Sequence, residues 1–68
     1  MLCEPNDMKV GTYFYSKFSS NIWKKVSDDG FIIVLPTPKS QIYGSWNFDG
    51  PREIVSLSDL EVLKAQNL

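Results

Sequence analysis

The sequence predicts a mainly β protein, a single small five-stranded antiparallel barrel that ends in a short C-terminal helix. Two β-prone runs, residues 22–27 and 31–35, flank an Asp-Asp-Gly sequence at 28–30, which is typical of a tight hairpin turn. The run 31–35 is entirely apolar and rich in β-branched residues, as expected for a central strand that is covered on both faces. Further strand-like runs follow at roughly even spacing with turn residues between them, a pattern that favours a small barrel.

The chain is expected to form one domain. Its 68 residues are enough for a single core, and 43% hydrophobic and 22% charged residues lie in the range of globular proteins. Residues 1–8 contain turn-forming residues without periodicity, so we expect them to be a flexible N-terminal leader. The barrel and its C-terminal helical turn are predicted to occupy residues 9–68.

The first strand, residues 10–18, alternates between two sets of side chains. Phe14 and Phe18 share one face, and because phenylalanine has no polar group that needs water, we expect this face to point inward. Tyr13 and Tyr15 lie on the other face, which we expect to point toward water.

Alternation in the second half of the chain predicts a fourth strand over residues 41–48 and a fifth over 52–57. Together with the hairpin, these runs complete the five strands of the predicted barrel. The residues that we expect at the centre of its core are Phe14, Phe31, Ile33, Trp46 and Leu60.

The C-terminal segment carries a helix signal. Ser58 followed by Glu61 matches a capping box, which predicts a helix of about two turns with Ser58 as its N-cap. Leu57, Leu60 and Leu63 are then expected to close onto the core.

Three features of the chain resemble SH3-like barrels, and within them the Tudor-like group. They are Trp23 near the start of the second strand, the apolar run 31–35, and the closing segment 54–60, which reads as a strand that runs into a helical turn. The resemblance covers roughly residues 9–63 and implies the barrel fold. The third strand is not followed by an Asp-Tyr-Gly-Asn-like segment, where Tudor domains place part of their aromatic cage, so the resemblance does not imply recognition of methylated residues.

The composition argues against an enzyme, a metal site and a membrane protein. The chain has no histidine, the commonest general base and metal ligand, and Cys3 is its one cysteine. We therefore expect no catalytic residue, no metal and no cofactor. One cysteine excludes an internal disulfide, and no apolar stretch approaches the ~20 residues that cross a bilayer, so a cytoplasmic protein is predicted.

The candidate function depends on the aromatic and basic side chains that the predicted barrel leaves facing water. Flat rings beside ammonium groups suit protein interfaces and single-stranded nucleic acid equally well. Seven basic and eight acidic residues give a net charge of −1, which favours a protein partner. The predicted partner-binding residues are Tyr13, Tyr15, Lys17, Trp23, Lys25 and Tyr43.

We therefore predict a non-enzymatic protein-binding module that acts as a small stand-alone adaptor or inhibitor. Short chains of this kind are familiar in phage genomes, so a phage-encoded modulator of a host protein is one form of this prediction. The alternatives are a small barrel that binds single-stranded nucleic acid and a structural subunit that assembles with itself through an exposed strand edge. A purely structural interpretation has Trp23 and one tyrosine plugging the barrel ends while the lysines solubilise its edge. Neither a membrane nor a small-molecule substrate is expected.

Overall fold

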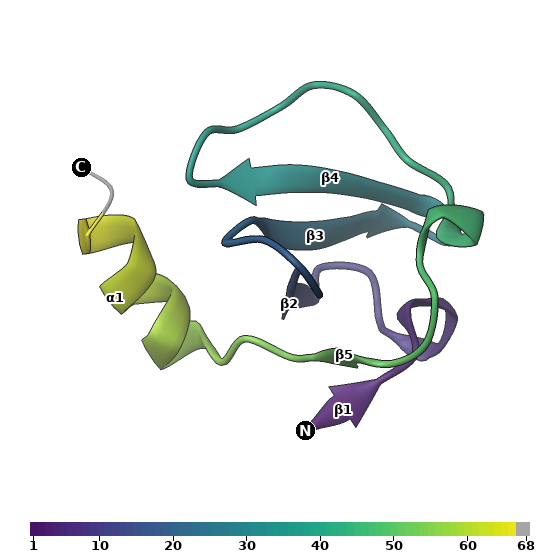
Figure 1. Cartoon of the computed structure of the whole chain (residues 1–68), viewed down its shortest axis with the longest axis horizontal. Helices are drawn as coiled ribbons and strands as arrows, with labels where there is room; N and C mark the ends of the chain where they lie inside the picture. The colour runs from purple at the N-terminus through teal and green to yellow at the C-terminus, as the bar shows by residue number, and fades with distance from the viewer. Residues whose placement is uncertain (67–68) are drawn as a thin grey trace.

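The computed structural model describes residues 1–66, and in that part of the chain it has five strands, two short 3-10 helices and one α-helix (Figure 1). Residues 67 and 68, which the predicted domain includes, lie outside the described residues. In chain order the elements are β1 (Leu2–Cys3), η1 (Pro5–Asp7), β2 (Tyr13–Tyr15), β3 (Ile22–Ser27), β4 (Gly30–Leu35), η2 (Ser45–Asn47), β5 (Arg52–Glu53) and α1 (Leu57–Gln66).

The strands form two antiparallel sheets, which do not close into a barrel. One sheet has the order β2-β3-β4, and the other pairs β1 with β5. The chain after β5 runs along the outer edge of β2, where Phe14 and Ile54 form an isolated bridge and the Val55 amide donates to the Tyr13 carbonyl at 2.9 Å. The mainly β class with a C-terminal helix is thus confirmed, whereas the closed barrel is not found.

The β3–β4 hairpin is the element that follows the sequence pattern most closely. β3 has the predicted bounds, and β4 begins one residue earlier than predicted, at Gly30. The turn does not use a left-handed backbone at Gly30, because the positive-φ residues in the described chain are Gly11 and Gly50. A Cβ at position 30 would meet the Ser27 hydroxyl, so a larger residue there requires the Ser27 side chain to move.

The three-stranded sheet carries a hydrophobic cluster on each face. Phe14 lies opposite Trp23 in the register of β2 and β3, and its ring belongs to the cluster of Met8 and Phe31. Side chains alternate along a strand, so the neighbouring tyrosines of β2 point to the other face, where the cluster of Ile22, Val55 and Leu60 lies. A 68-residue chain therefore divides its core between two layers.

The N-terminal segment, which we expected to be a flexible leader, contributes a strand to the two-stranded sheet and apolar side chains to the core. β1 pairs with β5, with Cys3 opposite Arg52. η1 follows directly, and Pro5 and Met8 are buried. Residues 1–8 are thus held by strand pairing and by apolar contacts. The sequence of this segment has no periodic pattern that would predict them.

The segment between β4 and β5 differs from the predicted fourth strand over residues 41–48. It arches past β4 as a loop and ends in η2 (Figure 1). Tyr43 forms an isolated bridge with β4, exchanging two backbone hydrogen bonds of 2.9 and 2.8 Å with Phe31, and the Lys39 amide donates to the Ile33 carbonyl at 2.9 Å. Trp46 lies in η2 and is 84% exposed, so its prediction as a core residue was wrong.

The C-terminal helix is present but begins earlier than the capping box predicted. The Ser56 hydroxyl accepts a hydrogen bond of 3.1 Å from the Asp59 amide, so Ser56 takes the capping role that we assigned to Ser58. Leu60 is buried as predicted, and Leu63 packs against the same cluster. Leu57 is 77% exposed, because it is the first residue of α1 and not the last of a strand.

Candidate binding site

The structure does not bring the six predicted partner-binding residues onto one face. Tyr13 and Tyr15 are half-buried on the sheet face to which α1 contributes Leu60, and they pack against Ile22, Val55 and Leu60. Their exposure to water was expected because the phenylalanines of β2 were placed inward. Both faces of β2 are in fact covered, so the two tyrosines belong to the second core cluster.

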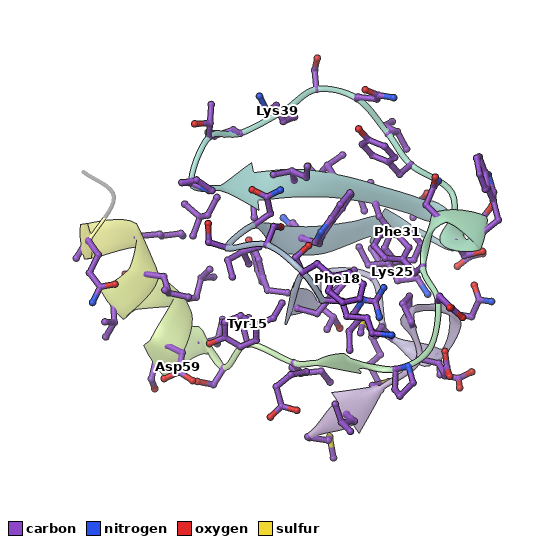
Figure 2. All side chains as sticks on the ribbon, viewed as in Figure 1. Tyr15, Phe18, Lys25, Phe31, Lys39 and Asp59 are labelled. Atoms are coloured by element: carbon purple, nitrogen blue, oxygen red, sulfur yellow. The ribbon has the colours of Figure 1, made fainter. Side chains whose placement is uncertain are left out.

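Lys25 is also not part of an exposed face, which corrects its prediction as a surface residue. Its side chain is 3% exposed and its Nζ donates hydrogen bonds to the carbonyls of Pro5, Asn6 and Met8 at 3.0, 3.2 and 2.8 Å. The Nζ also lies 5.7 Å from the centre of the Phe31 ring, beside it in Figure 2. Lys25 therefore holds the N-terminal segment against the sheet.

Trp23 lies on the opposite face of the sheet from the two tyrosines of β2, and Tyr43 contacts it there. Lys17 lies in the loop that follows β2. Trp23 is half-buried against the first core cluster, and its ring meets Tyr43 edge to face with centroids 5.1 Å apart. Lys17 is exposed, with its Nζ 5.4 Å from the ring centre of Phe18. Phe18 is 91% exposed, so the prediction that it points inward was wrong.

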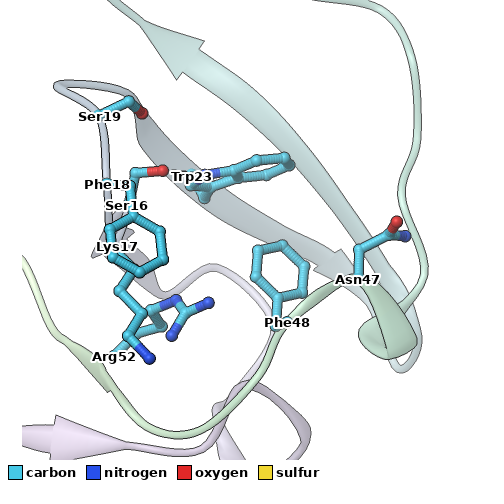
Figure 3. Close-up of a pocket in the computed structure, with 8 residues that line it drawn as sticks. All are labelled: Ser16, Lys17, Phe18, Ser19, Trp23, Asn47, Phe48 and Arg52. Carbon is cyan, nitrogen blue, oxygen red and sulfur yellow. Dashed lines mark hydrogen bonds between the residues drawn. The ribbon is translucent and has the colours of Figure 1, made fainter.

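A hollow of about 190 Å³ lies between the loop that follows β2 and the segment that leads into β5 (Figure 3). Trp23 of β3 forms its wall on the sheet side. The residues that line it are Ser16, Lys17, Phe18, Ser19, Trp23, Asn47, Phe48 and Arg52. Two of them, Lys17 and Trp23, were predicted as partner-binding residues.

Aromatic contacts fix the walls of the hollow. The Trp23 and Phe48 rings meet edge to face with centroids 4.9 Å apart, and Phe48 meets Phe14 of the core at 5.4 Å. The Trp23 indole Nε1 donates to the Ser16 hydroxyl at 3.2 Å, which ties the loop after β2 to the sheet. The walls are thus continuous with the core and are largely formed in advance of any ligand.

Arg52 is the central charged group of the hollow. The side chain is 8% exposed, and its guanidinium carbon lies 5.8 Å from the centre of the Phe48 ring. Its Nη1 donates to the Asp49 carbonyl at 2.8 Å. That contact depends on the Asp-Gly-Pro turn at 49–51, in which Gly50 has a φ of +81° that only glycine adopts readily.

The guanidinium has further N–H donors that the protein does not use. Among the described residues no fully buried side-chain nitrogen or oxygen lacks a hydrogen-bond partner, so these donors reach solvent. Because Arg52 is almost entirely covered and lines the hollow, the donors open into the hollow.

The other polar groups of the hollow add no negative charge. The Ser16 oxygen already accepts from Trp23, which leaves its own O–H hydrogen to donate. Asn47 turns its amide nitrogen to the Gly44 carbonyl at 3.0 Å. No aspartate or glutamate lines the hollow. Its chemistry is therefore that of an aromatic-walled site for an anionic group.

Asp29 positions one end of this region from outside the hollow. Its Oδ1 accepts a hydrogen bond of 2.8 Å from the Ser45 amide at the start of η2. Hydrogen bonding from the Ser45 side chain, and next from its backbone, lowers the pKa of Asp29 below its ordinary value of 3.8. The carboxylate thereby holds the short helix that carries Asn47 to the rim.

Sequence reasoning missed Phe18, Phe48 and Arg52 as site residues. The sequence does contain one signal for two of them, because the tight turn at 49–51 brings the residues on either side of it close together. It contains no signal for the approach of that turn to the loop after β2, which depends on the long-range contact of Trp23 with Phe48.

Two further searches of residues 1–66 are negative. No group of three or more His, Cys, Asp or Glu side chains is close enough together to hold a metal ion. None of the helices in this range has both the length and the hydrophobicity that a bilayer span requires.

Comparisons with protein-family models, with curated proteins and with solved structures find no match to this chain.

Proposed function

We propose that this protein is a non-enzymatic binding module that captures a partner protein at the hollow beside Trp23. The observation that carries the proposal is the combination of a preformed aromatic wall with an almost buried arginine whose donors are largely unused. Tryptophan, tyrosine and arginine in a desolvated pocket are the residues that dominate binding energy at protein interfaces.

Exposed apolar residues around the hollow support a macromolecular partner. Phe18 lines the hollow and is 91% exposed, and Trp46 of the neighbouring η2 is 84% exposed. Exposed apolar patches that are rimmed by polar residues often mark a contact surface for another macromolecule. Of the residues predicted from the sequence, Lys17, Trp23 and Tyr43 remain in the proposed interface, whereas Tyr13, Tyr15 and Lys25 do not.

The resemblance to SH3-like barrels stays part of the proposal. It is supported by the way the chain extends the three-stranded sheet at both edges, with Ile54 beside β2 and Tyr43 beside β4. A role as an adaptor or inhibitor in the cytoplasm, encoded by a phage or not, is likewise a prediction that follows from the sequence.

The test is partner capture with a matched pair of variants. Phe18→Ala removes an exposed ring at the hollow, and Val62→Ala removes an exposed apolar side chain of α1 that does not line it. We expect a partner captured from cells that express this protein to be retained by Val62→Ala and lost by Phe18→Ala. Equal retention by both variants would place the interface elsewhere.

Single-stranded nucleic acid is the second candidate, and Lys17 favours it. The ammonium of Lys17 beside the exposed Phe18 ring is an arrangement that pairs a phosphate while a base stacks. Binding of a single-stranded oligonucleotide, measured by fluorescence anisotropy, should then weaken steeply as salt is raised. A flat response to salt, or no binding, rules out this candidate and leaves the protein-binding proposal unchanged.

A further inference from the structure

The hollow has the size of one amino-acid residue. A dry cavity of about 150 Å³ is large enough to hold benzene, and sites for drug-sized ligands begin at about 300 Å³. At about 190 Å³, the hollow accommodates one ring-sized or branched apolar group and a few further atoms. A nucleotide or a folded segment is too large to enter it.

The polar groups that line the hollow favour a ligand group with a negative charge. Arg52 opens its unused N–H donors into the hollow, the Ser16 hydroxyl has a hydrogen to donate, and the ammonium of Lys17 stands at the rim. A guanidinium presents its donors as a planar fork, which matches the two oxygens of a carboxylate. The walls beside this fork are the rings of Trp23 and Phe48.

We propose that the hollow binds the C-terminal residue of a partner peptide, with its carboxylate on Arg52 and its apolar side chain against Trp23 and Phe48. This inference rests on the protein-binding function proposed above and names the part of the partner that is recognised. The fork of Arg52 donates two parallel hydrogen bonds to the carboxylate, and Ser16 donates a third.

A chain end fits the hollow better than an internal acidic residue does. In a C-terminal residue the carboxylate and the side chain branch from one Cα, so both fill a space of one residue at the same time. An internal aspartate or glutamate brings only its carboxylate and a short stem, which leaves the faces of Trp23 and Phe48 uncovered. Apolar surface that stays wet contributes nothing to affinity.

The experiment is a nuclear magnetic resonance titration of the ¹⁵N-labelled full chain with short peptides. The first peptide is an N-acetylated tetrapeptide of three alanines and a final phenylalanine with a free carboxylate, and the second is the same peptide with a C-terminal amide. We expect the free acid to shift the Trp23 indole and Arg52 Nε signals saturably, with a dissociation constant on the order of 1 mM. The amide should bind about tenfold more weakly, because it is neutral and offers the guanidinium one acceptor oxygen instead of two.

Variants locate the carboxylate on Arg52. Arg52→Lys keeps the charge but removes the fork, so we expect about tenfold weaker binding of the free acid and an unchanged response to the amide. Ser16→Ala removes one donor without altering the charge, but it also removes the acceptor of the Trp23 indole. Its readout is therefore the ratio of acid to amide affinity, which should fall a few fold and keeps the test decisive if Arg52→Lys does not fold. Lys39→Ala, an exposed residue of the loop after β4, is the control and should bind as the wild type does.

Each other outcome overturns a defined part of the inference. Equal binding of the acid and the amide would show that the hollow does not recognise the carboxylate, and it would leave the proposed protein-binding function intact. If a peptide with an internal glutamate binds as well as the free acid, the hollow recognises a carboxylate but has no preference for a C-terminal residue. Benzoate that binds as tightly as the peptide retains the carboxylate on Arg52 but assigns the hollow to a small aromatic acid, which contradicts the proposed protein partner. No shift at Trp23 or Arg52 with any probe overturns the inference altogether.

Discussion

Lys25 and Arg52 are the buried charged residues among residues 1–66, and the structure treats them in opposite ways. Burying a cation without a carboxylate partner is costly unless hydrogen bonds replace the lost water. Lys25 has all its donors satisfied, by three backbone carbonyls of the N-terminal segment. Arg52 has one hydrogen bond, to the Asp49 carbonyl, and directs the remaining donors into the hollow.

This difference distinguishes a structural cation from one that is available to a ligand. The lysine ammonium is a compact group with three donors, so three carbonyls complete its coordination and leave nothing for a partner. The arginine keeps a planar fork open to solvent at the bottom of an aromatic-walled space. Burial alone would have grouped the two residues together, whereas the count of used donors separates them.

The largest expected effect comes from removing the ammonium of Lys25. Lys25→Met leaves three carbonyls of the N-terminal segment without their donor, so we expect a loss of about 3 kcal/mol in the free energy of unfolding. Because so small a domain has a stability of only a few kcal/mol, the variant should be largely unfolded at 25 °C. Urea denaturation measures the loss.

The control for this prediction is Lys24→Met, the adjacent residue of β3. Lys24 is half-buried and its Nζ lies 5.4 Å from the Tyr13 ring centre, and it donates no hydrogen bond to a backbone carbonyl among the described residues. We expect a change within about 0.5 kcal/mol. If both variants are equally stable, the three carbonyls do not depend on Lys25 and the comparison with Arg52 fails.

Trp23 belongs both to the core and to the hollow, and its truncation is the next largest effect. Trp23→Ala removes ring contacts with Phe14, Phe48 and Tyr43, and we expect a loss of about 2 kcal/mol because the indole is half-buried. Trp46→Ala, at a ring that is 84% exposed, should change stability by less than about 0.5 kcal/mol. Thermal unfolding of the two variants side by side checks this, and equal losses would contradict it.

Arg52 itself should matter less to stability than Lys25. Arg52→Met removes one hydrogen bond to the Asp49 carbonyl and keeps an apolar side chain against Phe48, so we expect a loss of about 1 kcal/mol. A loss as large as that of Lys25→Met would show that Arg52 is a structural cation too. The same urea series provides the measurement.

The smallest expected effect concerns Asp29, whose carboxylate accepts a hydrogen bond from the Ser45 amide. Its pKa is lowered in the folded state, chiefly by the Ser45 side chain and then by the Ser45 backbone, so the folded protein binds the proton less readily than the unfolded chain. The resulting stability is present above the ordinary pKa of 3.8 and is lost as the pH falls through the lower folded value. Asp29→Asn should therefore flatten the decline in stability below about pH 4, measured by urea midpoints across that range. A decline identical to that of the wild type would show that Ser45 does not hold the carboxylate.

Strand parity shows how far sequence reasoning reached and where it stopped. Trp23 and Lys25 are two residues apart, so they share a face of β3. Both were predicted to face water together with the tyrosines of β2, whereas the phenylalanines of β2 were predicted to point inward. The register puts Phe14 directly opposite Trp23, so all three side chains point to the same side. Alternation within one strand says nothing about which faces of two strands coincide.

The sequence by itself determined the elements that depend on neighbours along the chain. The hairpin of β3 and β4 follows from two β-prone runs with a short polar turn between them. The C-terminal helix was predicted from its spaced leucines and a capping serine, although Ser56 and not Ser58 caps it. Phe14, Phe31 and Leu60 were also recognisable as core residues, and Ile33, also predicted there, is half-buried.

Only the tertiary structure decided the burial of Lys25, the exposure of Phe18 and Trp46, and the existence of the hollow. Each of these depends on contacts between segments that are far apart in sequence, such as Lys25 with Met8 or Trp23 with Phe48. Such contacts form when a backbone segment happens to supply acceptors or a ring at the right distance. Hydrophobicity and spacing describe a residue's own strand or helix, and they carry no information about what another segment brings to it.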